Sequence, residues 1–360
     1  MEILKKDFLF SFSLFFLLGL SLILLSSISL KENPVFYSLK RQCIFLAISF
    51  LIFLFFSQMD WRSWINNSIA LFFYFSSLFF LILVLILGTP LKGARGWFQI
   101  GSFNFQPLEL AKFSLILILA KFLAVHHKRV WQYPLLFKTA FFSFLPISLV
   151  ILQPDLGGAI ILFLIWFFLV LISGIKPKQI FLLLLLILVG ASFSWFFILK
   201  PYQKERIISF LNPQQDPLGS GYNRLQALIA IGSGRFLGKG LGGGTQTQLR
   251  FLPLAKTDFI FSALAEELGL LGIILFLIFF ILLIYRLTEH SVNFSNNFCS
   301  LFTIGFTFKI LIETIINVLM NLGLLPIVGI GLPFISLGGS QLFFNFLALG
   351  IISSMIKYQT

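Results

Sequence analysis

The sequence has 360 residues, of which 58% are hydrophobic and 11% charged, with a mean hydropathy of +1.00 and a formal net charge of +13. An ordinary soluble domain carries roughly 25% charged residues, so the composition excludes that class and predicts a polytopic membrane protein. The two cysteines, Cys43 and Cys299, lie far apart in predicted spans, which indicates packing residues and neither a disulfide nor a metal site.

Apolar runs long enough to cross about 30 Å of hydrocarbon recur along the chain, and each must be helical because lipid offers the backbone no hydrogen-bond partners. The first follows Lys5 and Lys6 and exceeds a signal-peptide core of about 7 to 15 residues, so we expect an uncleaved span at 8–28. Further spans are expected at roughly 40–57, 65–87, 107–125, 136–152, 157–174, 179–199, 258–285, 298–322 and 339–356. The sequence therefore predicts an all-α polytopic membrane protein, a single domain over residues 1–360 with about ten transmembrane helices.

Lysine and arginine in the short loops predict the orientation. With the N-terminus inside, roughly ten of them lie in cytoplasmic segments and about five in external loops. This bias predicts cytoplasmic N- and C-termini. It places the long loop at about 200–257, between the seventh and eighth spans, outside the cell.

The long external loop is basic and rich in glycine. Its run from Ile231 to Gly244 allows backbone amides to approach a ligand closely, because glycine has no Cβ and accepts positive φ. Long loops contribute little to orientation, so we attribute the positive charge to ligand binding, and amides with Arg and Lys suit a phosphate. The basic residues are Lys204, Arg206, Arg224, Arg235, Lys239, Arg250 and Lys256, against Glu205 and Asp216.

Ionisable residues inside predicted spans are a second signal, because a charge in hydrocarbon costs at least about 2.5 to 3.5 kcal/mol unless it is paired or faces water. In each of two pairs, an acidic and a basic residue lie on the same helix face and can neutralise each other. In addition, two adjacent glutamates lie about two turns after an aspartate. For each, a structural bridge between helices and a direct role in catalysis are both open. Asp155, at a span end, is either functional or simply the cap of the next helix. The other residues are Glu109 with Lys112, Lys309 with Glu313, Glu266 with Glu267, and Asp258.

Several short motifs stand out in chain order: Lys92-Gly-Ala-Arg-Gly-Trp97, Gln106-Pro-Leu-Glu109, Gln153-Pro-Asp-Leu-Gly157, Gln226-Ala-Leu-Ile-Ala-Ile-Gly-Ser-Gly234, Gly244-Thr-Gln-Thr-Gln-Leu-Arg-Phe-Leu-Pro253, Thr257-Asp-Phe-Ile-Phe261, Leu264-Ala-Glu-Glu-Leu-Gly269 and Leu332-Pro-Phe-Ile-Ser336. In this order they resemble the SEDS family (shape, elongation, division and sporulation), over nearly the whole chain. The run from Gly244 to Pro253 is more similar to the RodA branch of that family than to FtsW.

The resemblance implies a peptidoglycan glycosyltransferase in the bacterial cytoplasmic membrane, with ten helices and an active site at the external face. Its substrate would be lipid II, a disaccharide-pentapeptide on undecaprenyl pyrophosphate, polymerised through β-1,4 links for cell elongation and shape. The family's catalytic aspartate matches Asp258, its paired glutamate and lysine match Glu109 and Lys112, and its Gln-Pro-Asp aspartate matches Asp155. A class B penicillin-binding protein is the partner that the resemblance implies.

Elementary chemistry is compatible with that transfer. An α-linked donor and a β-linked product require one inverting displacement, with a base on the attacking hydroxyl and positive charge near the departing pyrophosphate. Asp258 can be the base. A divalent cation, Mg²⁺ or Mn²⁺, can share the pyrophosphate charge, although no ligand cluster demands one. The expected substrate-binding residues are Arg206, Arg224, Arg235, Lys239, Arg250, Lys256 and Gln246.

The chain departs from the family pattern at five positions. One departure replaces a usual glutamate with leucine and another replaces a usual histidine with lysine, which we expect to make the site more positive. The departures are Leu108, Gly158, Leu254, Lys256 and Leu337.

Two other function classes are open: a lipid II flippase, in which buried charges line a pathway, and a non-catalytic scaffold for a penicillin-binding protein. No clear internal repeat supports the flippase. A nucleic-acid partner is not expected, because the basic loop lies outside the cell.

Overall fold

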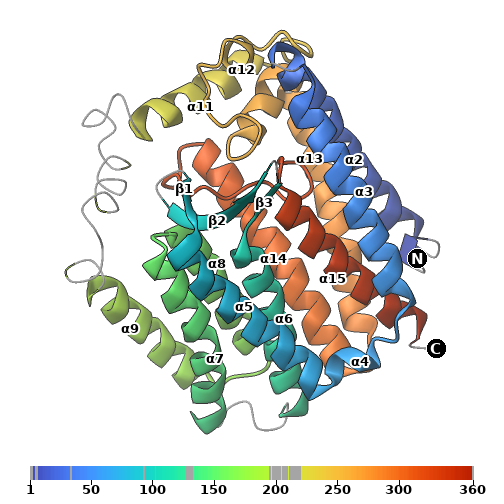
Figure 1. Ribbon diagram of the computed structural model, residues 1–360, viewed down its shortest axis with the longest axis vertical. Helices are drawn as coiled ribbons and strands as arrows, with labels where there is room; N and C mark the ends of the chain where they lie inside the picture. Colours follow the sequence, from blue (N-terminus) through green and yellow to red (C-terminus); the bar gives the residue numbers. More distant parts are fainter. Residues whose placement is uncertain are drawn as a thin grey trace.

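The long apolar runs form helices in the computed structural model, which describes residues 3–4, 7–32, 35–91, 94–101, 103–126, 133–193, 196, 204, 210 and 220–358. The long helices are α2 (Phe8–Ile28), α3 (Tyr37–Gln58), α5 (Asn67–Leu87), α6 (Pro107–Val125), α7 (Tyr133–Leu152), α8 (Leu156–Ile172), α9 (Pro177–Phe193), α13 (Ile260–Asn293), α14 (Asn297–Asn321) and α15 (Gly339–Lys357). Shorter ones are η1 (Ser29–Lys31), α4 (Arg62–Ile65), α11 (Ser220–Gly234) and α12 (Thr245–Gln248). Most of the long helices form one bundle, and α11 and α12 lie at one end of it (Figure 1).

Seven of the described helices are long and apolar enough to cross a membrane, namely α2, α3, α5, α7, α13, α14 and α15, and α8 is a shorter apolar helix. The expected fourth span, α6, carries Glu109, Lys112 and Lys121. The expected seventh span, 179–199, corresponds to α9. Part of that expected range lies outside the described residues. The all-α polytopic class is therefore confirmed, whereas the count of ten spans stays a prediction.

A small sheet was not predicted. β1 (Thr89–Leu91), β2 (Ala94–Ile100) and β3 (Phe103–Phe105) form an antiparallel sheet in the order β1-β2-β3. Gly101, with φ of 61°, makes the turn between β2 and β3, a conformation that glycine adopts without strain. The ring of Phe80 on α5 packs 6.5 Å from Phe98 and 5.6 Å from Phe105, between ring centroids, and anchors the sheet to the bundle.

Helix α13 is broken at Gly269, which has φ of 66° and ψ of −162°. A β-carbon there would lie 2.3 Å from the backbone nitrogen of Gly238, so only glycine fits. A break inside apolar surroundings leaves backbone groups that must find partners in the protein. They find them in the loop that follows α11: Lys239 and Gly240 donate to the carbonyls of Glu266 and Glu267, while Leu270 and Leu271 donate to those of Arg235 and Phe236.

Both chain ends lie on the same side of the bundle. The Ile3 amide donates to Ser353 Oγ at 3.3 Å, and Arg62 Nη2 donates to the Tyr358 carbonyl at 3.4 Å. Figure 1 shows the N- and C-termini on the same flank. The expected placement of both ends on one side agrees with this, and which side faces the cytoplasm stays a prediction.

Candidate active site

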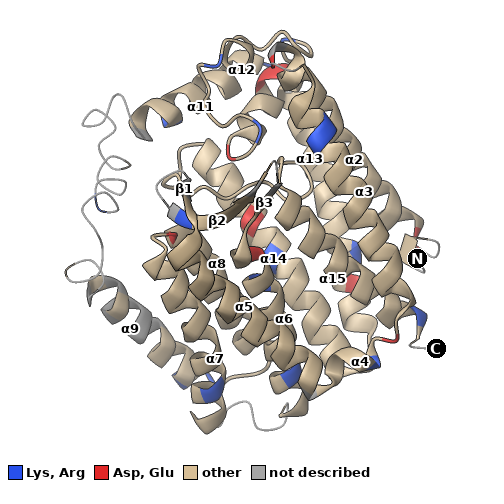
Figure 2. Cartoon of the chain, viewed as in Figure 1, with Lys and Arg blue, Asp and Glu red and all other residues tan. Residues whose placement is uncertain are grey.

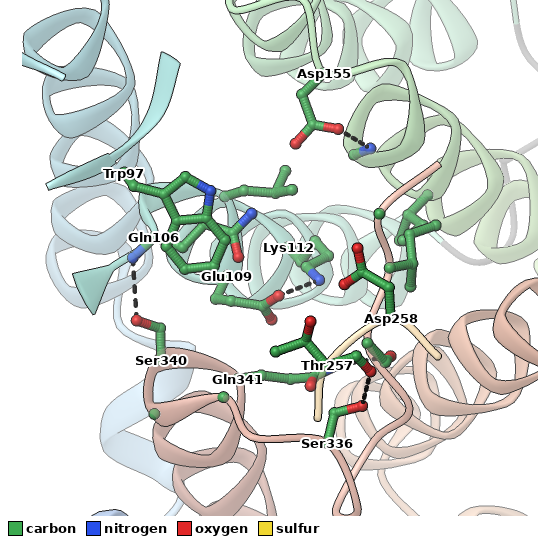
Figure 3. Close-up of a pocket in the computed structure, with 18 of the residues that line it drawn as sticks. Trp97, Gln106, Glu109, Lys112, Asp155, Thr257, Asp258, Ser336, Ser340 and Gln341 are labelled. Carbon is green, nitrogen blue, oxygen red and sulfur yellow. Dashed lines mark hydrogen bonds and ion pairs between the residues drawn. The ribbon is translucent and has the colours of Figure 1, made fainter. Parts of the chain in front are cut away.

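A pocket lies where the first turn of α6, the start of α8, the segment before α13 and the segment leading into α15 meet (Figure 3). The segment before α15 brings Gly329–Gly331 and Ser336–Gly338 to the same place, the first turn of α15 adds Gly339–Gln341, and β2 adds Trp97. The ionisable residues of the lining are Glu109, Lys112, Asp155 and Asp258. The structure thus gathers four of the residues predicted as functional, from distant parts of the chain, into one site.

The two predicted charge pairs form one buried network between α6 and α14. Lys112 Nζ lies 2.5 Å from both Glu109 Oε1 and Glu313 Oε1. Lys309 Nζ lies 3.0 Å from Glu313 Oε2 and 3.5 Å from Glu109 Oε2, and it donates to Asn345 on α15 at 2.7 Å. These four side chains are 5% exposed or less, and two acidic groups face two basic ones, which is how ionisable groups are tolerated inside a membrane protein.

In Figure 2, most of the bundle carries no charge, and a group of acidic and basic residues lies in its middle near α14. Phenylalanine rings pack beside it: the centroid of Phe113 on α6 lies 6.1 Å from that of Phe302 on α14 and 6.1 Å from that of Phe344 on α15. The apolar surroundings exclude water and strengthen the ion pairs.

Asp258 lies two residues before the start of α13, with its carboxylate directed into the pocket (Figure 3). The residue is 3% exposed. Its backbone carbonyl accepts hydrogen bonds from Asn317 Nδ2 and Asn321 Nδ2 on α14, each at 3.0 Å. The helix network therefore fixes the backbone of this residue, which is the condition for a well-aimed catalytic group.

Asp155 is the N-cap of α8. Its Oδ1 accepts from the Gly158 amide at 2.8 Å, shown in Figure 3. The capping role considered from the sequence is confirmed. The same side chain lines the pocket, so the cap does not exclude a functional role.

The segment before α15 completes the wall of the pocket. Ser336 Oγ donates to the Thr257 carbonyl at 2.6 Å and accepts from the Leu332 amide at 2.7 Å. Gln341, in the first turn of α15, donates from Nε2 to Glu313 Oε2 at 3.2 Å, and so connects α15 to the ionic network. The carbonyl of Asp258 is thus held from α14, and that of Thr257 from the segment before α15.

The basic loop residues that the structure describes do not line the pocket, and among the described lining residues Lys112 is the one cation. Lys239 pairs with Glu266 at 2.9 Å, and Arg224 Nη1 donates to the Phe210 carbonyl at 2.9 Å. Arg235 and Arg250 are exposed, while Arg206 lies outside the described residues. Their predicted role in substrate binding stays a prediction.

Lys256 forms an ion pair with Glu32, in the loop between α2 and α3. The departure at 256 therefore does not add an unbalanced positive charge beside Asp258, because Glu32 neutralises Lys256. Lys256 is thus a paired cation, and the expectation of a more positive site stays a prediction.

The glycine loop uses its backbone amides inside the protein. Gly242 donates to Ser27 Oγ at 2.7 Å and Gly243 to the Gly240 carbonyl at 3.0 Å, and the amides of Lys239 and Gly240 bind the break in α13. The expectation that these amides meet a ligand is therefore wrong for these residues. The glycines are needed for close backbone packing instead.

Glu266 and Glu267 hold that loop. Glu266 accepts from Lys239 Nζ, from the amides of Gln246 and Thr247, and from the hydroxyls of Thr245 and Thr247, at 2.6–3.3 Å. Glu267 accepts from Ser27 Oγ at 2.7 Å and Gln248 Nε2 at 3.2 Å. The sequence left a structural and a catalytic role open for these two glutamates. The structure shows that both Glu266 and Glu267 have the structural role. Gln246, predicted to bind substrate, contributes its backbone to this arrangement.

Sequence reasoning missed Asn317, Asn321, Gln341 and Glu32. The two asparagines lie four residues apart in an apolar span, and a polar pair at that spacing is a usable signal of a shared helix face. Glu32 and Gln341 have no such signal, since their partners are more than two hundred and about thirty residues away in sequence, respectively.

The divalent cation stays a prediction. Within the described ranges, no group of three or more His, Cys, Asp or Glu side chains is placed to hold a metal ion.

The fold and the site define a class: an all-α polytopic membrane protein with a buried ionic network beneath a carboxylate-lined pocket. The chain belongs to the family of FtsW, RodA and SpoVE, described as "Cell cycle protein", whose model matches residues 5–360.

Individual relatives agree with this assignment. The chain is 37% identical to the probable peptidoglycan glycosyltransferase FtsW of Wigglesworthia glossinidia brevipalpis, over 96% of this chain and 93% of that protein. It is 36% identical to the peptidoglycan glycosyltransferase MrdB of Escherichia coli K12, over 79% of this chain and 77% of that protein.

A solved structure has the same fold. It is described as "Structural coordination of polymerization and crosslinking by a peptidoglycan synthase complex", and its matching chain gives a TM-score of 0.81 at 32% identity, covering 97% of this chain and 98% of that one.

Proposed function

We propose that this chain is a peptidoglycan glycosyltransferase that polymerises lipid II into β-1,4-linked glycan strands at the outer face of the cytoplasmic membrane. Family membership and the names of its relatives support the enzyme class. The observation that carries the proposal is the position of Asp258: a buried carboxylate in a pocket between helices, on a backbone held by two asparagines.

In the proposed reaction, Asp258 is the general base. The 4-hydroxyl oxygen of one sugar attacks the anomeric carbon of another, the bond from that carbon to pyrophosphate breaks, and the hydroxyl proton passes to the Asp258 carboxylate. Undecaprenyl pyrophosphate leaves with the electron pair of the broken bond. One displacement converts the α-linkage of the donor into the β-linkage of the product.

The departing pyrophosphate needs positive charge, and the described lining offers little of it. Lys112 is shared between Glu109 and Glu313, and Asp155 and Asp258 add two carboxylates. The basic loop supplies the countercharge in this proposal. Of the predicted residues, Arg235 and Arg250 have exposed side chains, and we propose these two for that role.

The ionic network positions the site rather than reacting. Glu109 and Lys112 form part of the pocket wall, and Gln341 joins Glu313 to the segment that packs against Thr257. A neutral network with fixed geometry keeps α6, α14 and the pocket wall in register.

A class B penicillin-binding protein is the proposed partner, and it would supply the peptide cross-links. A matching chain in a structure described as a peptidoglycan synthase complex supports this. We propose cytoplasmic N- and C-termini, contact through α6, α13 or α14, and a role in cell elongation, although relatives named FtsW and MrdB are about equally similar to this chain.

The test uses the full-length protein in liposomes with its penicillin-binding partner and fluorescent lipid II. Wild type should produce glycan polymer, and Asp258→Ala should produce none while it retains its fold and partner binding. Movement of lipid II across the bilayer without polymer would instead show a flippase. Partner binding with neither activity would show a scaffold.

A further inference from the structure

Glu32 and Lys256 connect the loop after α2 to the segment just before Asp258. The Glu32 carboxylate accepts from Lys256 Nζ, and also from the Ser38 amide at 2.8 Å and the Ser38 hydroxyl at 2.5 Å. The side chain of Glu32 is 11% exposed and that of Lys256 is 30% exposed. Burial alone would raise the pKa of Glu32, but the hydrogen bonds from Lys256 and Ser38 outweigh it and hold that pKa below its usual value. Glu32 is therefore an ionised, fixed anchor for Lys256.

The segment that Lys256 belongs to is a tight turn. Leu254 has φ of 55°, which a leucine adopts only where its surroundings enforce it. The Leu254 carbonyl accepts from the amides of Thr257 at 3.0 Å and Phe259 at 3.3 Å. The conformation of this turn therefore sets the position of Asp258 and the point at which α13 begins.

Other contacts hold the backbone of the same turn: Asn317 and Asn321 on α14 donate to the Asp258 carbonyl, each at 3.0 Å. The Lys256 carbonyl accepts from the Leu337 amide at 2.9 Å, and the Thr257 carbonyl accepts from Ser336 Oγ at 2.6 Å. Both come from the segment before α15. Glu32 acts on the turn through the Lys256 side chain and belongs to the α2–α3 loop instead. The ion pair therefore ties the turn to a separate element of the protein.

We propose that the Glu32–Lys256 pair is a positioning contact for the transferase: it fixes the turn at 254–258 so that the Asp258 carboxylate points into the pocket. Lys256 then acts through the turn and does not bind pyrophosphate, in contrast to the substrate-binding role expected from the sequence. This inference rests on the proposed function, since it concerns how the proposed base is aimed. Misplacement of a reacting group by about 1 Å can cost on the order of a hundredfold in rate, so a positioning contact affects turnover before it affects binding.

The test is a charge-exchange cycle in the full-length protein with its partner: Glu32→Lys, Lys256→Glu and the double exchange. Each single change should lower kcat by about tenfold with KM within about twofold. The double exchange restores opposite charges across the contact and should return kcat to within about threefold of wild type. Lys40→Glu, an exposed lysine on α3 outside the contact, is the matched control and should keep kcat within about twofold of wild type.

Direct binding of pyrophosphate by Lys256 predicts a different result. If Lys256 binds pyrophosphate, Lys256→Gln should raise KM at nearly constant kcat, and the double exchange should be no better than Lys256→Glu alone. Either finding would overturn the inference.

Thermal unfolding of the same variants separates the possible failures. If a charge reversal prevents folding, the neutral pair Glu32→Gln and Lys256→Gln replaces it, and Lys256→Arg, which keeps the charge, should retain kcat. Wild type that yields no polymer would overturn the proposed function, and the positioning role of the pair with it. Active wild type whose double exchange stays impaired would overturn the positioning role alone.

Discussion

At residue scale, Gly158 and Leu108 are fitted to each other in the pocket wall. A β-carbon on Gly158 would lie 2.4 Å from Leu108 Cδ2 and 3.0 Å from Asp155 Oδ2. Leu108 is itself buried, with 6% exposure. The two family departures are therefore a matched pair: the leucine occupies the space that a larger residue at 158 would need, and the wall beside Asp155 is apolar.

Gly158→Thr should consequently destabilise the protein by about 1–3 kcal/mol, because Leu108 and the Asp155 cap must both move. The double variant Leu108→Ser with Gly158→Thr should recover most of that loss. Thermal unfolding measures it, with Gly96→Ala as the control, since a β-carbon at Gly96 meets nothing nearer than 3.8 Å. A Gly158→Thr protein that unfolds like wild type would refute the steric pairing.

At element scale, the break in α13 and the loop after α11 form one unit. The loop backbone satisfies the groups freed at Gly269, and the Glu266 carboxylate, fully buried, gathers five donors from residues 239–247. A carboxylate is suited to this position because it only accepts hydrogen bonds.

Glu266→Gln places an amide NH₂ against these donors and leaves Lys239 without its counter-ion, so the loop at 236–248 should loosen. Hydrogen exchange at the Gln246 and Thr247 amides should accelerate by about tenfold or more, in line with the cost of breaking a largely buried ion pair. Glu289→Gln, whose side chain is 38% exposed, is the control at the far end of α13. Unchanged exchange in Glu266→Gln would show that Glu266 does not hold the loop.

Some elements could be predicted from sequence and others could not. The helices follow from apolar runs, because lipid imposes helical hydrogen bonding on any spanning segment. The sheet at 89–105 could not be predicted, since its strands are short and their pairing depends on packing against Phe80. The glycine run at 231–244 predicts a ligand cradle from the sequence, because free amides suit anions. Its true partner, the broken turn of α13, is visible only in three dimensions.

At the scale of the whole molecule, Asp7 ties the start of α2 to the end of α13. Its Oδ2 accepts from Arg286 Nε and His290 Nε2, both at 2.8 Å, and its Oδ1 accepts from the Phe10 amide at 3.0 Å. Burial alone would raise the pKa of Asp7, but these hydrogen bonds outweigh it and hold the pKa below its ordinary value of 3.8. A lowered folded-state pKa stabilises the protein above the unfolded value, and this stability is lost as pH falls through the folded value.

Asp7→Asn keeps an N-cap and removes the charge. At pH 7 it should lower the free energy of unfolding by about 1.5–3 kcal/mol, the scale of hydrogen bonds to a charged group. Below about pH 4 the difference from wild type should shrink, as the wild-type carboxylate becomes protonated. Thermal unfolding between pH 3 and 7 in detergent, at about one-unit steps, checks this, with exposed Asp60→Asn as control. A constant difference over that range would contradict the assignment.

The candidate site was predictable in part, and the limit is physical. Local spacing indicated that Glu109 could pair with Lys112 and that Lys309 could pair with Glu313, and both pairs form. Their union across α6 and α14, and the contact of Glu32 with Lys256, depend on how helices pack. One sequence records no such distances, so it does not predict that the segment at 329–341 lines the pocket beside Asp258.

The decisive measurement is the polymerisation rate of Asp258→Asn on lipid II, beside wild type and Asp60→Asn. Asparagine preserves the size of the side chain and cannot take up a proton as a carboxylate does. We expect kcat to fall by at least about a hundredfold in Asp258→Asn, the usual contribution of a general base, while Asp60→Asn matches wild type. An Asp258→Asn enzyme that polymerises lipid II within about threefold of the wild-type rate would contradict the assignment of Asp258 as the base.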